Sequence, residues 1–381
     1  MTVDPLRVMV FLHSFEPGGV ERVALRLCGA WAPSVDVQLV MGRTKGVMAA
    51  EAPAGLPLHV TSSGPLPTAG WESAWMMFVL ARRIRALRPD VLFAAGNSYA
   101  VVAVAMKLAL GRACPPIVLK ISNDLGRADL PLPIRLLYRL WCRVQGRLID
   151  HFVGLAPAMR AEIAHAMRVS PDCITIIDDP ALGEADHARL AAIGTARTAP
   201  GPTRRYLAIG RLATQKNFAR AIAAFARAAR AGDTLAIVGE GRQRARLEQQ
   251  VAARGLAGQI SLPGHGDAVA ALAAADMLVL SSDYEALPAV VVEALASGLP
   301  VIATDCCVSM RDLVGRFGTV VPAGDTEALA AAMVAQPLPD AATRAAMAAA
   351  MQRFTITNGA RAYAALFATL SATKAATFRS F

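Results

Sequence analysis

The sequence is poor in the residues that hold metal ions or cross-link small folds. Its 381 residues include only six cysteines and six histidines. No two cysteines have the C-x2-C spacing of a metal site, and the histidines are scattered. This pattern predicts no bound metal and reduced thiols in a cytoplasmic protein. The cysteines stand at positions 28, 114, 142, 173, 306 and 307.

Long apolar runs are also missing. The longest candidate, residues 99–110, is shorter than a membrane-spanning helix and contains Lys107, so it predicts a buried helix. The apolar part of the first residues is only as long as a strand, which favours the absence of a secretory signal.

The length and the alternation of apolar strands with helices predict two α/β domains, each a doubly wound parallel sheet. We expect Rossmann-like domains at residues 1–185 and 205–358. Between them, residues 186–204 predict a linker, because apolar periodicity weakens there and Gly, Pro and Thr accumulate. Residues 359–381 predict a C-terminal helix that returns toward the first domain.

The most informative stretch is SSDYEALPAVVVEALASGLPVIATD, residues 281–305. It predicts a loop after a buried strand, a helix that begins at Pro288 and ends at Gly298, and another strand. The free amides at such a helix start suit a phosphate or hydroxyl groups. Glu285 in the loop and Glu293 in the helix would bracket a ligand there. The alternative is a helix-stabilising Glu followed by a solvated one.

A second polar loop lies upstream, in YLAIGRLATQKNFARAIAAFARAA. It follows a predicted strand and contains Arg211 and Lys216, with Asn217 as a predicted helix cap. A guanidinium and an ammonium together neutralise a diphosphate without a metal. Two solvated surface cations are the alternative, but the place at a strand's carboxyl end favours ligand binding.

Taken together, GGVERVALRL, GRLATQKN, VGEG, ISLPGH and the E-x7-E pair resemble the family 4 glycosyltransferases. The resemblance covers nearly the whole chain. It implies a retaining, metal-independent enzyme of the GT-B fold, in which two Rossmann-like domains face a central cleft. The first domain would bind the acceptor and the second a nucleotide-diphosphate sugar as co-substrate, with no other cofactor.

The resemblance also implies roles for individual residues. Arg211 and Lys216 would hold the donor diphosphate, Glu285 would lie at the transferred sugar, and Glu293 would bind the ribose. Glu285, Arg211 and Lys216 form the predicted catalytic set. The predicted donor-binding residues are Gly18, Gly19, Gly210, Arg211, Lys216, Glu285, Ala286, Leu287, Ala289, Val290 and Glu293.

The chain departs from the family pattern at three places. Ala286 stands where a glycine usually follows the first Glu. Lys120 or Asn123 stands near the position of a family histidine, and Asp179 replaces the Asn of an Asn-Pro pair. These departures indicate an altered acceptor side.

Further candidates surround the predicted site. His13, at the end of the first strand, and Lys120 and Asn123 are candidates for the acceptor or sugar side, although His13 also suits a packed strand end. Gly239 and His265 are candidates for the side of the nucleotide base.

A formal net charge of +10 is partly concentrated in residues 133–148. Arg135, Arg139, Arg143 and Arg147 recur every fourth residue there, and the other side of the predicted helix is apolar. This pattern predicts peripheral contact with an anionic membrane at its cytoplasmic face. An ordinary surface helix packed on the sheet is the alternative. Nucleic acid is disfavoured, because exposed aromatic residues do not alternate with the basic ones.

The sequence therefore predicts a glycosyltransferase that uses a saccharide or lipid-linked saccharide acceptor in exopolysaccharide or lipopolysaccharide assembly. One alternative is a nucleotide-sugar epimerase of similar fold. Another is a non-catalytic sugar-nucleotide or glycan-binding partner of a synthesis complex. A dinucleotide-dependent oxidoreductase is disfavoured, because Gly18-Gly19 does not extend into G-x-G-x-x-G.

Overall fold

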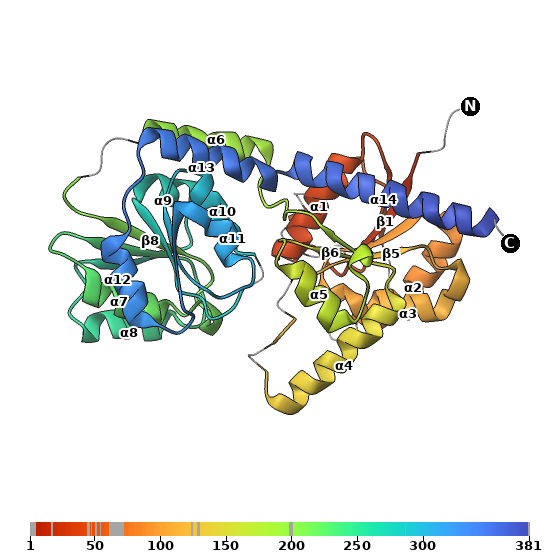
Figure 1. Cartoon of the computed structure of the whole chain (residues 1–381), viewed down its shortest axis with the longest axis horizontal. Helices are drawn as coiled ribbons and strands as arrows, with labels where there is room; N and C mark the ends of the chain where they lie inside the picture. Colours follow the sequence, from red (N-terminus) through yellow and green to blue (C-terminus); the bar gives the residue numbers. More distant parts are fainter. Residues whose placement is uncertain are drawn as a thin grey trace. The chain divides into compact units, whose positions relative to one another are not determined.

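The computed structural model divides the chain into two compact units (Figure 1). Unit 1 contains Met1–Pro180 and Ile356–Phe381, and unit 2 contains Ala181–Thr355. The structure describes residues 5–16, 18–43, 46, 48–49, 52–53, 55–60, 72–122, 125–127, 130–197, 201–285 and 287–379.

Unit 1 is built on a parallel sheet of seven strands in the order β3-β2-β1-β4-β5-β6-β7. Its strands are β1 (Arg7–Leu12), β2 (Asp36–Met41), β3 (Leu58–Val60), β4 (Val91–Ala94), β5 (Ile117–Lys120), β6 (His151–Gly154) and β7 (Ile174–Ile176). Its helices are α1 (Gly19–Trp31), α2 (Glu72–Leu87), α3 (Ala100–Leu110), α4 (Leu132–Leu148), α5 (Met159–Met167) and α14 (Ile356–Arg379), with short 3₁₀ turns η2 (Asn97–Tyr99), η3 (Gly111–Ala113) and η4 (Pro171–Cys173).

Unit 2 is built on a parallel sheet of six strands in the order β10-β9-β8-β11-β12-β13. Its strands are β8 (Arg205–Ile209), β9 (Thr234–Val238), β10 (Ile260–Gly264), β11 (Met277–Leu280), β12 (Val301–Thr304) and β13 (Gly318–Val321). Its helices are α6 (Glu184–Ala196), α7 (Phe218–Ala228), α8 (Arg244–Ala253), α9 (Ala268–Ala274), α10 (Ala289–Ala296), α11 (Met310–Val314), α12 (Thr326–Ala335) and α13 (Ala341–Met351), with 3₁₀ turns η5 (Thr214–Lys216), η6 (Gly315–Phe317) and η7 (Gln352–Phe354).

The predicted class, two doubly wound parallel sheets, is confirmed. In unit 2 the strand order reverses between β8 and β11, and in unit 1 between β1 and β4. Ligands of open parallel sheets bind at the carboxyl ends of the strands at such reversal points. Each unit therefore has one reversal point, at the carboxyl edge of its sheet, where a ligand is expected to bind.

Helices cover both faces of the unit 2 sheet, and each face has its own apolar core. One core contains buried residues of α6, α10, α11 and α13, and the other those of α7, α8 and α12. Helix α10 is buried along most of its length, at Val291, Val292 and Leu295 among others. Its start is therefore fixed at the sheet edge by packing.

The C-terminal helix α14 belongs to unit 1, where it packs on α1 and β4. Trp31 of α1 meets Tyr363 and Phe367 of α14 at centroid distances of 5.9 and 5.2 Å. The Trp31 indole also donates a 3.0 Å hydrogen bond to the carbonyl of Ala360. This contact joins two parts of the chain that are far apart in sequence.

The expected linker at residues 186–204 differs from the structure, because α6 occupies Glu184–Ala196. Only Leu190 and Gly194 of α6 are buried, so its apolar periodicity is weak. Contacts with α13 and α10 hold this helix in place. Tertiary packing thus produces a helix where the local pattern predicted irregular chain.

Candidate functional site

The two polar loops predicted from the sequence lie together at the strand reversal of unit 2. The first follows β8 and contains η5, and the second follows β11. The ammonium of Lys216 contacts Oε1 of Glu285 at 2.5 Å. The side chains of this pair are only 18% and 9% exposed, respectively. The fold therefore joins two predicted catalytic residues that are 69 positions apart.

Further polar residues hold the two loops together, and of these only Asn217, as a helix cap, was predicted from the sequence. The Ser282 hydroxyl donates to Glu285 Oε1 at 2.7 Å, and the Gln215 amide donates to the Tyr284 carbonyl at 2.9 Å. Asp283 accepts from the side chain of Asn217 and forms a 2.7 Å ion pair with Arg220. For the others, the only sequence signal was proximity to the motifs. The Ser282 hydroxyl, together with Lys216, fixes the orientation of the Glu285 carboxylate.

Arg211 and the start of α10 lie on the loops of the same edge. Arg211 is exposed and, within the described ranges, forms no ion pair. Helix α10 begins at Ala289, one residue later than predicted, with Pro288 as its N-cap. The first amides of a helix have no intrahelical acceptor, so those of Ala289 and Val290 are available to a ligand. Glu293 is partly buried on the second turn of α10.

Gly239 and His265 lie at the ends of the neighbouring strands β9 and β10. The Gly239 amide donates to the Gly264 carbonyl at 2.8 Å, and the Gly210 amide donates to the Val238 carbonyl at 3.0 Å. A Cβ atom on Gly239, whose φ is +148°, would lie 1.9 Å from the carbonyl oxygen of Gly210. The close contact between these loops therefore requires a glycine at position 239. His265 is exposed beside them.

Two of the predicted positions, Ala286 and Asn123, lie outside the described residues. Leu287 is partly buried and packs against the apolar core that contains α10.

In unit 1, a hydrogen-bonded group occupies the strand reversal between β1 and β4. The His13 ring stacks on Tyr99, with centroids 4.9 Å apart and planes at 18°. The Tyr99 hydroxyl donates to Glu21 Oε1 at 2.8 Å. Burial lowers the pKa of His13, although Glu21 opposes this shift. Glu21 and Tyr99 were missed from the sequence, because only the fold brings them to His13.

Beside this group, Gly18 is the N-cap of α1 and Gly19 is the first residue of the helix. A Cβ atom on Gly18 would lie 2.0 Å from Oε2 of Glu21, so the carboxylate fills the space that glycine leaves. Glu21 stands at the third position of α1, where a carboxylate compensates the helix dipole. Because like charges repel, this helix start favours hydroxyl groups over a phosphate.

Lys120, the last residue of β5, is buried. Its ammonium forms an ion pair with Asp179, and the two side chains are 3% and 14% exposed, respectively. Both residues are departures from the family pattern, and the structure pairs them with each other. Lys120, a candidate for the acceptor or sugar side, is thus engaged in a buried ion pair.

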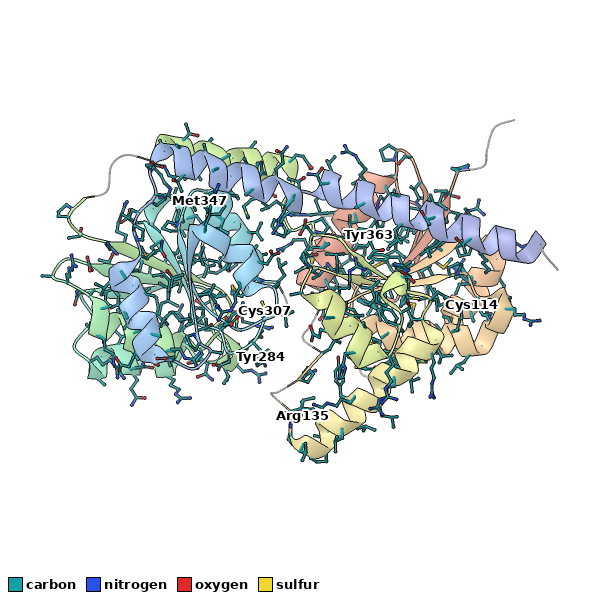
Figure 2. All side chains as sticks on the ribbon, viewed as in Figure 1. Cys114, Arg135, Tyr284, Cys307, Met347 and Tyr363 are labelled. Carbon is teal, nitrogen blue, oxygen red and sulfur yellow. The ribbon has the colours of Figure 1, made fainter. Side chains whose placement is uncertain are left out.

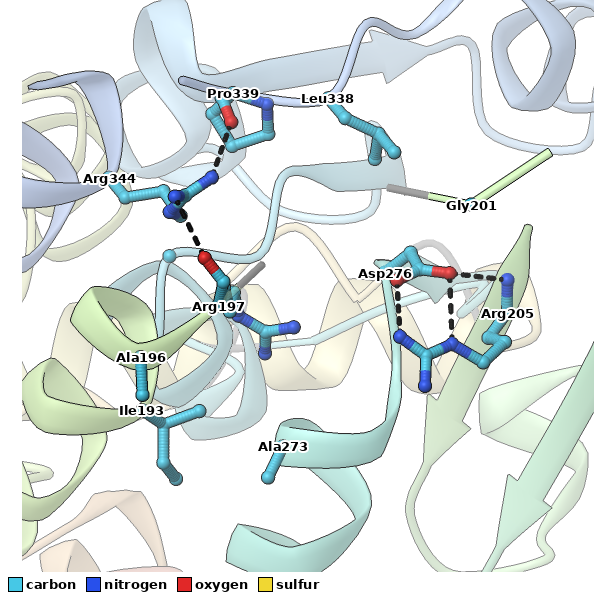
Figure 3. A pocket seen from close by; sticks show the side chains of 11 residues that line it. Ile193, Ala196, Arg197, Gly201, Arg205, Ala273, Asp276, Leu338, Pro339 and Arg344 are labelled. Atoms are coloured by element: carbon cyan, nitrogen blue, oxygen red, sulfur yellow. Dashed lines mark hydrogen bonds and ion pairs between the residues drawn. The ribbon is translucent and has the colours of Figure 1, made fainter. Parts of the chain in front are cut away.

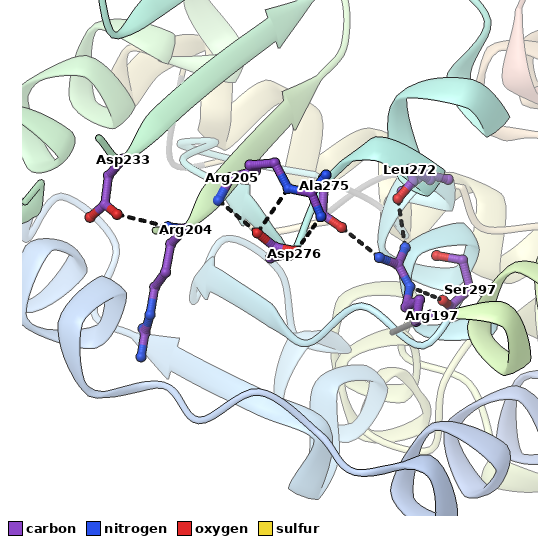
Figure 4. Close-up of polar contacts among 8 residues, drawn as sticks. All are labelled: Arg197, Arg204, Arg205, Asp233, Leu272, Ala275, Asp276 and Ser297. Atoms are coloured by element: carbon purple, nitrogen blue, oxygen red, sulfur yellow. Dashed lines mark hydrogen bonds and ion pairs between the residues drawn. The ribbon is translucent and has the colours of Figure 1, made fainter. Parts of the chain in front are cut away.

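A separate hollow in unit 2, of about 360 Å³, lies at the opposite edge of the sheet, where strands begin (Figure 3). Arg197 donates to the carbonyls of Leu272, Ala275 and Ser297 at the ends of α9 and α10 (Figure 4). Arg344 likewise binds the carbonyl of Arg197, at the end of α6, at 3.2 Å. The arginines in this hollow bind the carbonyls at the C-terminal ends of helices, so we interpret the hollow as structural.

Neither a metal cluster nor a membrane span is found in the described part of the chain. No group of three His, Cys, Asp or Glu side chains there is arranged to hold a metal ion. Among the same residues, no helix combines the length and apolarity needed to cross a membrane.

Two family models match the sequence. One, described as Glycosyltransferase Family 4, matches residues 17–179, and the other, Glycosyl transferases group 1, matches residues 203–336.

Several curated relatives are named as glycosyltransferases. The chain is 31% identical over 118 residues to the amylovoran biosynthesis glycosyltransferase AmsD of Erwinia amylovora, a match that covers 31% of the chain and 34% of the relative. It is 29% identical over 312 residues to a 2-deoxystreptamine N-acetyl-D-glucosaminyltransferase of Streptomyces fradiae, covering 72% and 71% of the two chains. The matched part is thus about a third of the first relative and most of the second.

Solved structures share the fold. The lipopolysaccharide outer core galactosyltransferase WaaB superimposes with a TM-score of 0.74 at 15% identity, over 95% of this chain and 99% of that one. HepE of Anabaena, in complex with UDP-glucose, superimposes with a TM-score of 0.63 at 19% identity, over 99% and 100%. The predicted GT-B fold is confirmed by these matches.

Proposed function

Because the chain belongs to the family 4 glycosyltransferases, we propose that it transfers a sugar from a nucleotide-diphosphate donor to a saccharide or lipid-linked saccharide acceptor in polysaccharide assembly. The observation that carries this proposal is the Lys216–Glu285 pair at the strand reversal of unit 2. It combines a cation and a hydroxyl acceptor at the place where open parallel sheets bind ligands. The names of the relatives support polysaccharide assembly.

The donor diphosphate would bind between the two loops and the start of α10. The Lys216 ammonium has three N–H donors and gives one to Glu285, which leaves two for phosphate oxygens. The exposed Arg211 supplies a planar guanidinium, and Ala289 and Val290 supply backbone amides. These groups would stabilise the negative charge that grows on the diphosphate as the bond to the sugar breaks.

The transferred sugar would bind to Glu285. One carboxylate oxygen accepts from Lys216 and Ser282, whereas Oε2 has only a 3.5 Å contact with the amide of Gln215. Oε2 therefore has acceptor capacity for sugar hydroxyls. Glu293 would bind the ribose in the same manner, and the base would lie toward Gly239 and His265.

We infer a retaining reaction on the resemblance to the family. The acceptor hydroxyl would attack the sugar from the face that the diphosphate leaves, and a diphosphate oxygen would take its proton. Exclusion of water from the site would protect the donor from hydrolysis.

The acceptor side would use the His13, Tyr99 and Glu21 group of unit 1. The lowered pKa of His13 keeps its ring neutral near pH 7, so one ring nitrogen accepts a hydrogen bond. Lys120 has no part here, because Asp179 engages it inside the unit.

Helix α4 carries the proposed membrane contact. Five apolar side chains in its first half are more than half exposed, so this part of the helix does not pack on the sheet. They are Leu132, Ile134, Leu136, Leu137 and Leu140. The start of α4 projects from unit 1, and Figure 2 labels Arg135 there.

Exposed arginines follow this apolar patch along α4, at positions 139, 143 and 147. Apolar side chains next to cations suit the boundary between acyl chains and anionic headgroups. We therefore propose that an anionic membrane surface, where lipid-linked acceptors reside, covers α4.

Vesicle sedimentation tests the membrane contact. Full-length protein should sediment with phosphatidylglycerol-containing vesicles and not with neutral phosphatidylcholine vesicles. The Leu136→Ser/Leu137→Ser variant should lose most of this binding, whereas Leu108→Ser, an exposed leucine of α3, should retain it. Equal binding to both vesicle types would contradict the proposal.

Calorimetric titration with UDP-, GDP- and ADP-sugars tests the donor site. One donor should bind, Lys216→Met and Glu293→Gln should abolish its binding, and Glu327→Gln, on the exposed face of α12, should not. If no donor binds, the site assignment is wrong and a non-catalytic glycan-binding role becomes the better explanation. If a donor binds but is never turned over with any acceptor, only the proposal of catalysis is refuted, and the assignment of the donor site stands.

A further inference from the structure

Two adjacent cysteines follow β12 at the carboxyl edge of unit 2. The backbone carbonyl of Cys306 accepts a 3.0 Å hydrogen bond from the amide of Glu285. The sulfur of Cys307, labelled in Figure 2, lies 3.2 Å from the Ser309 hydroxyl. Nothing in the proposed transfer uses either thiol. The pair is nevertheless bonded directly to the loop that holds Glu285.

The two sulfurs differ in their surroundings. The Cys306 side chain is buried. Cys307 is partly buried, and its sulfur forms a 3.2 Å hydrogen bond with the Ser309 hydroxyl, in which either atom can donate. Donors that point at a sulfur stabilise its thiolate. Of the pair, Cys307 is therefore the more accessible thiol, and the Ser309 hydroxyl can donate to its thiolate.

The pKa values of the cysteines agree with this geometry. The hydrogen bond from Cys306 and those from Ser309 hold the pKa of Cys307 below its ordinary value, against the opposing effects of burial and the charge of Glu285. Burial raises the pKa of three other thiols instead: Cys28 to about 12, and Cys114 and Cys142 to about 11. The thiolate, not the thiol, is the reactive form.

We propose that Cys307 is a thiol-modification site, on which a low-molecular-weight disulfide forms a mixed disulfide that blocks the donor site. The Cys307 thiolate attacks one sulfur of the small disulfide. A Cys307–sulfur bond forms as the original S–S bond breaks, and the other half leaves as a thiolate. The reaction is a thiol–disulfide exchange and needs no other oxidant.

The consequence follows from the contacts of the pair. A substituent on Cys307 would lie beside the segment whose Cys306 carbonyl fixes the amide of Glu285. The negative charge of the Glu285 carboxylate acts to raise the pKa of both thiols, so it lies near them. Modification and donor binding would therefore exclude each other, and a reducing thiol would restore binding. This consequence rests on the proposed donor site.

The first experiment measures the thiols alone. Native full-length protein is mixed with 5,5′-dithiobis(2-nitrobenzoate), and the released coloured thiolate is followed. One thiol should react at least about tenfold faster than the three thiols whose pKa burial raises, because each pKa unit changes the thiolate fraction about tenfold. Cys307→Ser should lose this fast phase, and Cys173→Ser, which removes the other partly buried thiol, should keep it. Mass mapping of the labelled wild-type protein identifies the residue independently of any variant.

A fast phase that survives Cys307→Ser, or a label found elsewhere, overturns the proposal. The second experiment titrates the donor selected above into labelled and unlabelled protein. Binding should be lost on labelling, return with dithiothreitol, and resist the reagent in Cys307→Ser. Labelling at Cys307 that leaves donor affinity unchanged also overturns it. Because the thiol kinetics need no donor, failure of the donor site is distinguished from failure of the modification site.

Discussion

Removal of Lys120 is expected to destabilise unit 1 far more than removal of Lys120 and Asp179 together. The ion pair is buried, with side chains only 3% and 14% exposed. Lys120→Met leaves the Asp179 carboxylate without its cation. Burial, together with the charge of that carboxylate, already raises the pKa of Tyr363. An unpaired buried charge costs about 3–5 kcal/mol, whereas an apolar replacement of a whole pair is often close to neutral.

Intrinsic tryptophan fluorescence during urea unfolding measures this effect in unit 1 alone. All four tryptophans, at positions 31, 71, 75 and 141, belong to unit 1. The cycle compares wild type with Lys120→Met, Asp179→Asn and the double variant. We expect a coupling free energy of about 2–3 kcal/mol, the upper part of the range for residues in contact.

Lys107 provides the matched control, because its ion pair with Asp150 lies in the same unit and is more exposed, at 26% and 34%. Lys107→Met should cost no more than about 1 kcal/mol. The reasoning is refuted if Lys120→Met costs no more than Lys107→Met, or if the double variant is as unstable as the sum of the single ones.

Two further effects on stability are expected. Gly239→Ala should lower the free energy of unfolding of unit 2 by about 2 kcal/mol or more, because its methyl group would meet the Gly210 carbonyl at 1.9 Å. Gly258→Ala, with nothing within 4 Å, is the control, and equal melting temperatures of the two variants would contradict the prediction. In unit 1, burial lowers the pKa of three histidines below 6.5: His13, His59 and His151. The unfolded chain binds these protons first, so the stability of unit 1 should be complete above about pH 6.5 and fall as the pH falls below it. A urea midpoint by tryptophan fluorescence that does not fall between about pH 7.5 and about pH 5.5 would oppose this.

The sequence predicted the strand and helix framework because strongly periodic segments and their Gly and Pro boundaries are local signals. It also indicated that Lys216 and Glu285 belong to one site, because both follow buried strands. Their direct contact was not predictable, since it depends on β8 and β11 being neighbours in the sheet. The roles of Arg211 and Glu293 stay predictions.

Lys120 and Asp179 show where sequence reasoning stopped. Lys120 was assigned to the acceptor side by its place in the family pattern, and Asp179 was noted as a separate departure. Each departure weakens the pattern alone, but together they form one buried pair across 59 positions. The signal available in the sequence was that the two departures introduce charges of opposite sign, which indicates an ion pair. Glu21 and Tyr99 carried no such signal, because only tertiary structure brings them to His13.

The contact between α1 and α14 has a consequence for the order in which the chain acquires its structure. Unit 2 is continuous, from Ala181 to Thr355, whereas unit 1 needs both ends of the chain. During synthesis, unit 2 can complete its core while Trp31 still lacks the carbonyl of Ala360 and the rings of α14. The earlier-made unit therefore finishes last, and it exposes an aromatic surface until the final helix has left the ribosome.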